Sequence, residues 1–302
     1  MKNILYSQAK RSGFTMMELI FVIVIMGLLS KFGVEFMAQA YKGYIYSKIN
    51  NSLQNESATA VEFIAKRLSY RIKDSVIARK ADGTFTGVQN ASGNTYTTLE
   101  WVGIDIDNLR GDRLPNWSGI IDLDAGNATN IRSLGTNTNT VNTLINTLSY
   151  GTSDINDTAL YFIGSNSDVN TSYGWDGVAL TSQTTAATHP VQTTANVTDF
   201  NSSIAGVTFA GVDVYEYYKL AWTAYALELA PDGNLTLHYN YQPWNGQDTN
   251  VTNTPNLQSQ LLMQNVSTFQ FRSIGDLLKI QVCVKSKLTG EEYSICKEKT
   301  IY

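Results

Sequence analysis

A nearly unbroken apolar run close to the N-terminus constrains this chain more than any other feature. The run extends from Leu19 to Leu29, and the wider stretch from Phe14 to Met37 contains 24 residues. As an α-helix this stretch is about 36 Å long, enough to cross the roughly 30 Å hydrocarbon core of a bilayer with some tilt. The sequence therefore predicts a single membrane-spanning helix over residues 14–37.

The residues around this run are in an unusual order. A secretory signal peptide has small residues after its apolar stretch, at the cleavage site. Here the basic and small residues Lys10-Arg11-Ser12-Gly13 come before the stretch. Cleavage after Gly13 would remove a basic leader, residues 1–13, and leave the apolar helix on the mature protein. Glu18 would then lie at the start of a membrane helix, where a carboxylate is costly and usually meets a partner.

This arrangement resembles the class III signal sequence of type IV prepilins and type II secretion pseudopilins. The resemblance implies that a prepilin peptidase cuts between Gly13 and Phe14 and methylates the new amine of Phe14. It also implies that Glu18 neutralises the N-terminal amine of an adjacent subunit, because a buried charge needs a counter-charge. The implied partners are other pilin-like subunits, met through the N-terminal helix, the peptidase and an inner-membrane assembly platform. Two residues depart from the family pattern: Lys31 interrupts the apolar run, and Glu35 stands where many pilins have a helix-kinking proline.

The pattern beyond Met37 predicts that the helix continues as an amphipathic segment over residues 38–80. Apolar residues recur at intervals of three, four and seven, and no proline or glycine occurs from Tyr44 to Lys80. Asp82-Gly83 is read as the stop signal. Residues 60–68 resemble the same stretch of the larger minor pilins and J-type pseudopilins. That group has a long helix packed on a β-rich head, so the predicted fold class is α+β.

Residues 81–302 are predicted to form a periplasmic head of antiparallel strands. Alternating segments at 225–229 and 235–239 flank the turn sequence 231–234, which predicts a β-hairpin. Two further strands are expected at 266–271 and 278–284. Between the helix and these predicted strands, residues 121–205 form a Thr-, Asn-, Ser- and Gly-rich insertion, which is expected to consist of loops, turns and edge strands. Aromatic residues such as Tyr161 and Trp175 indicate that this insertion is packed.

The chain has two cysteines, Cys283 and Cys296. Their spacing fits no common zinc site, so a disulfide formed in an oxidising compartment is expected. A two-residue hairpin turn centred between Thr289 and Gly290 would place the cysteines directly opposite each other, in a non-hydrogen-bonded pair. A three-residue loop would shift this register by one residue.

Charge is distributed unevenly within the net charge of −4. Residues 1–80 contain 12 Lys or Arg and 5 Asp or Glu, whereas residues 81–271 contain 4 and 17. So acidic a region is a poor surface for nucleic acid, whose binding depends on clustered cations, and any contact would have to use the helix or the last strands.

The sequence contains none of the common hydrolase, phosphate-binding or metalloprotease motifs, so neither catalysis nor a cofactor is expected. His189 is predicted to lie in a loop, and His238 to be a packing or surface residue on a strand. Incomplete calcium-loop patterns make weak metal candidates of four aspartates: Asp105, Asp107, Asp122 and Asp124.

Removal of the 13-residue leader would leave a mature chain of 289 of the 302 residues. The expected function is that of a minor pseudopilin, held in the inner membrane by a single helix until it joins a short periplasmic filament of a type II secretion or pilus-like machine. An alternative is a minor pilin of a type IV pilus or competence system that serves adhesion, motility or DNA uptake. A further alternative is a membrane-anchored binding protein that never polymerises.

Overall fold

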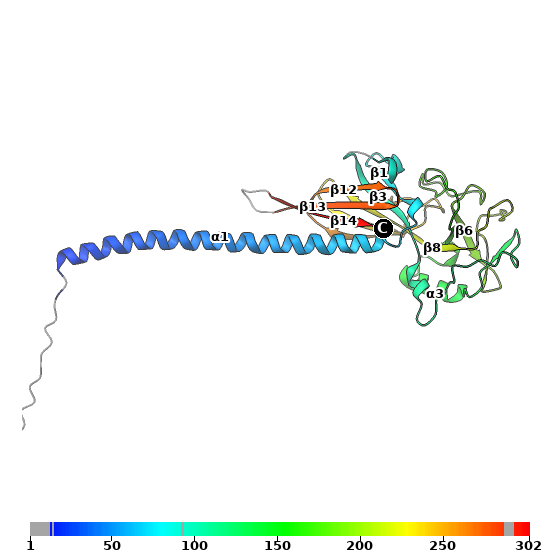
Figure 1. Ribbon diagram of the computed structural model, residues 1–302, viewed down its shortest axis with the longest axis horizontal. Helices are drawn as coiled ribbons and strands as arrows, with labels where there is room; N and C mark the ends of the chain where they lie inside the picture. The colour runs from blue at the N-terminus through cyan, green and yellow to red at the C-terminus, as the bar shows by residue number, and fades with distance from the viewer. Residues whose placement is uncertain (1–12, 14, 92–93, 287–292) are drawn as a thin grey trace, which may run out of the picture. The chain divides into compact units, whose positions relative to one another are not determined.

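The computed structural model describes residues 13, 15–91, 94–286 and 293–302 (Figure 1). The chain divides into two compact units, one ending at Ser52 and the other comprising Leu53–Tyr302. A single helix, α1 (Met16–Leu68), continues from the first unit into the second. The second unit, here called the head, contains the last part of α1 and antiparallel β-sheets, so the α+β fold class predicted from the sequence is confirmed.

Helix α1 ends at Leu68, twelve residues before the predicted end at Lys80. The amides of Tyr70 and Arg71 bond to carbonyls three residues back, which tightens the last turn, and Ile72 N then donates to Val102 O at 2.9 Å. Ile77–Lys80 form strand β1. The helical apolar spacing was misleading here because Ile72 and Val76 are buried through the sheet, which the sequence alone does not reveal. Asp82-Gly83 belong to the turn that joins β1 to the next strand, with Gly83 at a φ of +87°.

The largest sheet of the head has six strands in the order β11-β10-β9-β3-β1-β2. Neighbouring strands in this sheet are antiparallel. Its hairpin β9–β10 confirms the one predicted around residues 231–234, with Leu229 paired to Leu235. Besides β1, the strands are β2 (Phe85–Gly87), β3 (Tyr96–Gly103), β9 (Thr223–Leu229), β10 (Leu235–Tyr241) and β11 (Gln258–Met263).

A second sheet is built from the end of the chain: β12 (Val266–Ile274), β13 (Leu277–Lys285) and β14 (Ser294–Ile301). The predicted strands at 266–271 and 278–284 are confirmed as parts of β12 and β13. Figure 1 shows the three strands lying along the part of α1 that belongs to the head. The predicted turn between Thr289 and Gly290 lies outside the described residues.

The third sheet is drawn largely from the polar insertion and has five strands in the order β4-β7-β6-β5-β8. Together with α3 (Thr138–Leu148) it lies at the end of the head farthest from β12–β14 (Figure 1). Its strands are β4 (Asn130–Arg132), β5 (Ala159–Phe162), β6 (Thr188–Thr193), β7 (Asp199–Ser202) and β8 (Tyr218–Ala221). Short helical segments complete the head: α2 (Ile106–Arg110), η1 (Lys73–Ser75), η2 (Val88–Asn90) and η3 (Ile155–Asp157).

The insertion packs around a hydrophobic cluster that it shares with the segments flanking it, although its sequence is mostly polar. Trp117, Phe162, Phe200 and Tyr218 are buried in one cluster. Helix α3, which the sequence analysis missed, contributes Val141 and Ile145 to the same cluster. The signals for this helix were an Asn at the N-cap, Asn137, followed by apolar residues four positions apart. A second cluster, which includes Tyr173, Trp175 and Trp244, connects the insertion to the six-stranded sheet.

Candidate assembly helix and the head that holds it

The first part of α1 is apolar but lacks a protein environment in this structure. It contains the one helix window among the described residues that is long and apolar enough to cross a membrane, with a mean hydropathy of 2.2. None of that window is buried. Apolar side chains such as Ile20, Phe21, Ile25 and Leu29 are all exposed. A surface of this kind is stable in a lipid or protein environment rather than in water.

The predicted assembly residue, Glu18, lies in the first turn of α1. Its backbone amide is 3.4 Å from Thr15 Oγ1, and Leu19 N donates to Thr15 O at 3.2 Å, so Thr15 caps the N-terminus of the helix. A carboxylate in this turn is also favoured by the helix dipole. Gly13 is exposed and precedes the helix, whereas Phe14 and the rest of the predicted leader lie outside the described residues. The cleavage, methylation and assembly roles of Gly13, Phe14 and Glu18 therefore stay predictions.

The last part of α1 is fixed in the head by apolar packing. Its side chains Leu53, Ala60, Val61, Ile64 and Leu68 are buried. They recur at intervals of three, four and seven, which places them on one face of the helix. This part of the predicted amphipathic segment, up to Leu68, agrees with the pattern read from the sequence.

Polar contacts join the same part of the chain to the C-terminal sheet. Glu62 accepts a 2.6 Å bond from Lys299 Nζ on β14. Just after the helix, the buried Arg71 donates to the carbonyl of Asp276, in the turn between β12 and β13, at 2.8 Å. Burial lowers the pKa of Arg71, and the nearby Asp276 carboxylate opposes that effect. The end of α1 and the C-terminal sheet are thus held together by core packing and by directed bonds.

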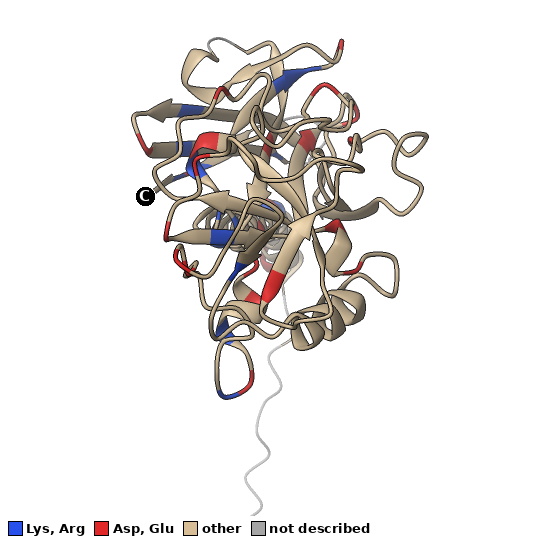
Figure 2. Ribbon diagram, turned by 90° about the vertical axis from the view of Figure 1, so that its right-hand side faces the viewer, with Lys and Arg blue, Asp and Glu red and all other residues tan. Residues whose placement is uncertain are grey.

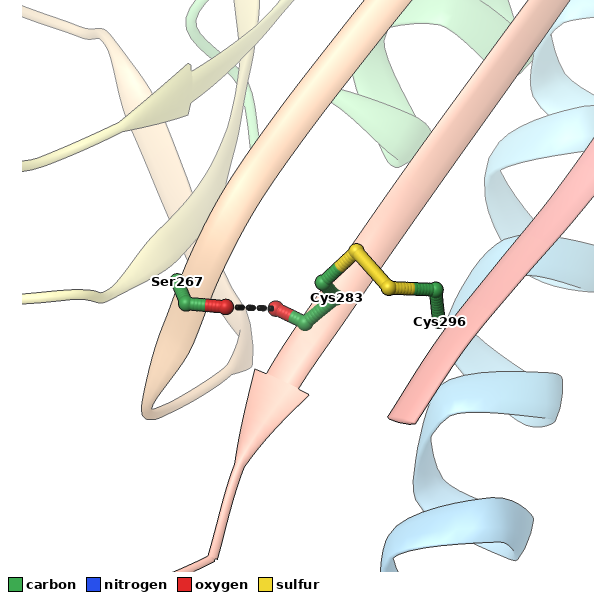
Figure 3. The surroundings of a disulfide bond; sticks show 3 residues. All are labelled: Ser267, Cys283 and Cys296. Atoms are coloured by element: carbon green, nitrogen blue, oxygen red, sulfur yellow. Dashed lines mark hydrogen bonds between the residues drawn. A yellow bond between two sulfur atoms is a disulfide. The ribbon is translucent and has the colours of Figure 1, made fainter. Parts of the chain in front are cut away.

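The predicted disulfide between Cys283 and Cys296 is confirmed. It joins β13 to β14, where the two residues are directly paired with Cα atoms 4.0 Å apart (Figure 3). Ser286 N donates to Tyr293 O, so this pair is hydrogen-bonded. Because bonded and non-bonded pairs alternate in an antiparallel ladder, the cysteines occupy a non-hydrogen-bonded pair. Ser267 Oγ donates to the carbonyl of Cys283 from β12, so all three strands are joined here (Figure 3).

A buried ion pair that the sequence analysis missed joins β1 to β3. The side chain of Glu100 has no exposed surface and accepts a hydrogen bond from Arg79 Nε. Burial opposes the charge on Arg79, but the neighbouring Glu100 carboxylate outweighs it, so the pKa of Arg79 is raised. Tyr241 Oη on β10 donates to the same carboxylate at 3.1 Å, and Arg79 donates to Trp175 O at 2.9 Å. The sequence near Glu100 does not reveal these partners, because Arg79 and Tyr241 come from other strands.

The four aspartates proposed as weak calcium ligands do not converge. Asp105 is buried and caps α2, with its carboxylate accepting bonds from the backbone and side-chain nitrogens of Asn108. Burial, the largest effect, raises the pKa of Asp105 to about 7. Asp107 is exposed, and Asp122 accepts bonds from the amides of Asp124 and Ala125. The described residues contain no group of three or more His, Cys, Asp or Glu side chains arranged to hold a metal ion.

The loop prediction for His189 is wrong, because this residue lies in β6 and is buried. Its Nδ1 is 3.0 Å from Gln183 Oε1, and its ring packs against Phe162. Burial lowers the pKa of His189 to about 4. The polar sequence around His189 is typical of a loop, and for this reason the strand was not predicted. In the folded chain, polar residues such as Gln183 and Ser202 are buried and hydrogen-bonded to each other.

His238 lies on β10, as predicted from the alternation. Its Nε2 is 3.1 Å from Glu228 Oε2, and its Nδ1 is 2.8 Å from Ser259 Oγ. The three residues come from the neighbouring strands β9, β10 and β11, and Glu228 is 45% exposed. A row of polar side chains across a sheet stabilises strand pairing.

Acidic residues are spread over the loops and strands of the head rather than gathered in one place (Figure 2).

No protein-family model matches this chain, and no curated protein or solved structure matches it either. The class is defined by the architecture: a long apolar N-terminal helix whose last part packs on antiparallel β-sheets, which is pilin-like. The apolar helix is suited to a membrane anchor or to a signal segment.

Proposed function

We propose that this chain is the precursor of a pilin-like filament subunit. A prepilin peptidase cuts it after Gly13, and the helix of residues 14–37 holds it in the inner membrane with the head in the periplasm. The observation that carries the proposal is the contrast along α1: the same helix is apolar and wholly exposed at its start, and buried in a disulfide-closed head at its end.

The mechanism that follows is mechanical, and the subunit catalyses nothing itself. Subunits wait in the bilayer and dock through Glu18 and the exposed apolar surface, which exchanges a lipid environment for neighbouring helices. Glu18 neutralises the N-terminal amine of the next subunit, because neither charge is stable alone in a low-dielectric environment. The assembly platform extracts the docked subunit, and the head travels with it because the end of α1 is part of the head core.

Within this class, we favour a minor subunit of a secretion or pilus-like machine. The head contains two hydrophobic clusters and a folded insertion, more than is needed to cover the end of one helix. A minor pilin of a type IV pilus would use the same helix in the same way, so the two assignments differ only in the machine that hosts the subunit.

The decisive experiment is N-terminal mass spectrometry of the membrane-bound protein from its native host. We expect a chain that begins at N-methylated Phe14. An intact Met1, or a cut after the apolar run, would contradict the proposal and leave an anchored or secreted β-protein. A chain that begins at Phe14 but never enters sheared filaments would instead support the non-polymerising alternative.

A further inference from the structure

Two opposite charges interrupt the exposed apolar part of α1. Lys31 and Glu35 are four residues apart, which places them one turn apart on the same face of the helix. Both side chains are exposed, and apolar residues such as Phe32, Val34 and Phe36 surround them. The two charges therefore lie within the apolar surface rather than at its end.

The short distance along the helix from Glu18 to Lys31 makes it difficult for both charges to reach water outside the membrane. Between Glu18 and Lys31 there are 12 uncharged residues, only about 18 Å of helix at 1.5 Å per residue. A bilayer core of about 30 Å needs roughly 20 residues. A helix that crosses the core from the region of Glu18 therefore brings Lys31 and Glu35 to its far side while they are still in or beside the hydrocarbon. Charges at such positions usually have a partner.

The helix itself does not supply that partner well. Among the residues that the structure describes, Lys31 and Glu35 form no ion pair with each other. Their order explains this, because a base four residues before an acid is the less favourable orientation within a helix. The pair is complementary to itself, however: a second parallel copy presents the same base and acid, one turn apart. Copies in one membrane are parallel because the basic leader fixes the same orientation for each.

We propose that Lys31 of one copy forms an ion pair with Glu35 of a second copy where two helices meet in the membrane. The inference rests on the proposed function, since it describes a contact made before or during assembly. In two helices that lie in register, Lys31 of one copy is one turn away from Glu35 of the other, and the long lysine side chain can span this distance. The pair can also form when one helix is shifted along the other by up to a turn. The pair would favour those arrangements of the apolar helices that bring Lys31 of one copy within reach of Glu35 of the other.

The test uses the full-length chain in membranes of its native host, with Ala38→Cys as the cross-linking reporter. Residue 38 lies two turns beyond Lys31 on the same face, and the native cysteines are bonded to each other and do not compete. We expect Lys31→Glu and Glu35→Lys each to reduce the cross-linked dimer by roughly three- to thirty-fold, the range measured for polar contacts between membrane helices. Co-expression of the two variant copies should restore the dimer, because each then meets the opposite charge.

Co-expression distinguishes an ion pair between two copies from an ion pair within one helix. A pair within one helix would be broken in both variants and could not be rescued by mixing them, so a failure to rescue overturns the proposal. Unchanged cross-linking in the single variants would overturn it as well, and would indicate that both side chains reach the headgroups. Lys42→Glu is the matched control, an identical change on the next basic residue of the helix, and it should leave the dimer intact.

Rescue of Glu35→Lys by Lys42→Glu rather than by Lys31→Glu would also overturn the proposed pairing. Filaments sheared from the same cells report separately on the proposed function. If the wild type forms filaments and the charge variants cross-link as well as the wild type, only the inference about Lys31 and Glu35 is rejected. If the processed chain forms neither filaments nor dimers, both that inference and the proposed function are rejected.

Discussion

At the scale of single residues, the head depends on charged groups whose surroundings differ sharply. Glu100 is fully buried on β3 and contacts Arg79 and Tyr241, while Glu228 on the next strand, β9, is 45% exposed and contacts His238. Water stabilises an exposed carboxylate whether or not it has a partner, whereas a buried one depends on its partners alone.

Glu100→Gln should therefore be far more damaging than Glu228→Gln. It leaves the Arg79 guanidinium, 16% exposed, without a counter-charge, which we expect to cost about 3–5 kcal/mol of unfolding free energy. Glu228→Gln removes a carboxylate from the same sheet and should cost less than about 1 kcal/mol. Denaturant unfolding of the full chain in detergent, followed by near-ultraviolet circular dichroism, measures both. Equal costs would contradict the importance given to the buried pair.

The lowered pKa of His189 affects how the stability of the head depends on pH. Its pKa is about 4 in the folded chain, below the ordinary value of 6.5. The unfolded chain therefore binds a proton between pH 6.5 and pH 4 that the folded chain does not. The stability linked to His189 is fully present above pH 6.5 and is lost as the pH falls towards 4, by up to about 3 kcal/mol.

We expect the unfolding free energy of wild type, relative to that of His189→Asn, to fall by up to about 3 kcal/mol as the pH falls from 7 to 4. The comparison of wild type and variant over the same range separates His189 from Asp105, which acts in the opposite direction. The raised pKa of Asp105 gives stability below pH 3.8 that is lost as the pH rises towards 7. A difference between wild type and variant that does not change with pH would show that His189 does not contribute.

At the scale of elements, the end of α1 and the last strands depend on one another. Leu53, Ile64 and Leu68 need the sheets to cover them, and β14 is an edge strand that contacts the helix through Lys299. The disulfide keeps β14 paired to β13, so it also helps to keep the helix seated.

Removal of the disulfide by Cys283→Ser together with Cys296→Ser should destabilise the head by about 2–3 kcal/mol, as expected for a loop closed over 13 positions. We also expect proteases to release β14 more readily, because an edge strand held by one neighbour opens locally. Unfolding with and without reductant measures the first effect, and limited proteolysis with mass spectrometry measures the second. Reductant should not affect the double variant, and a wild type that is equally insensitive would contradict the prediction.

At the scale of the whole molecule, the proposed function requires that anchoring and assembly be separable. Glu18→Gln removes a charge from the first turn of α1 but leaves the apolar helix and the head unchanged. We expect the variant to enter the membrane and to fold, but to be lost from sheared filaments by tenfold or more, on the order expected when a buried charge loses its partner. Glu18→Asp keeps the charge and should assemble better than Glu18→Gln. Equal assembly of the two variants would exclude an electrostatic role for Glu18.

The sequence by itself determined the features that depend on neighbours along the chain. The apolar helix, the hairpin at 231–234, the strands at 266–271 and 278–284 and the pairing of Cys283 with Cys296 all follow from local periodicity and turn chemistry, and the structure confirms them. Only the tertiary structure decided where α1 ends, because Ile72 is buried by pairing with Val102 from another strand. It also decided that His189 and Glu100 are interior, since their partners, Gln183 and Phe162 for one and Arg79 and Tyr241 for the other, come from other strands and segments. Local patterns fix what a segment prefers, and long-range burial fixes which of those preferences the folded chain keeps.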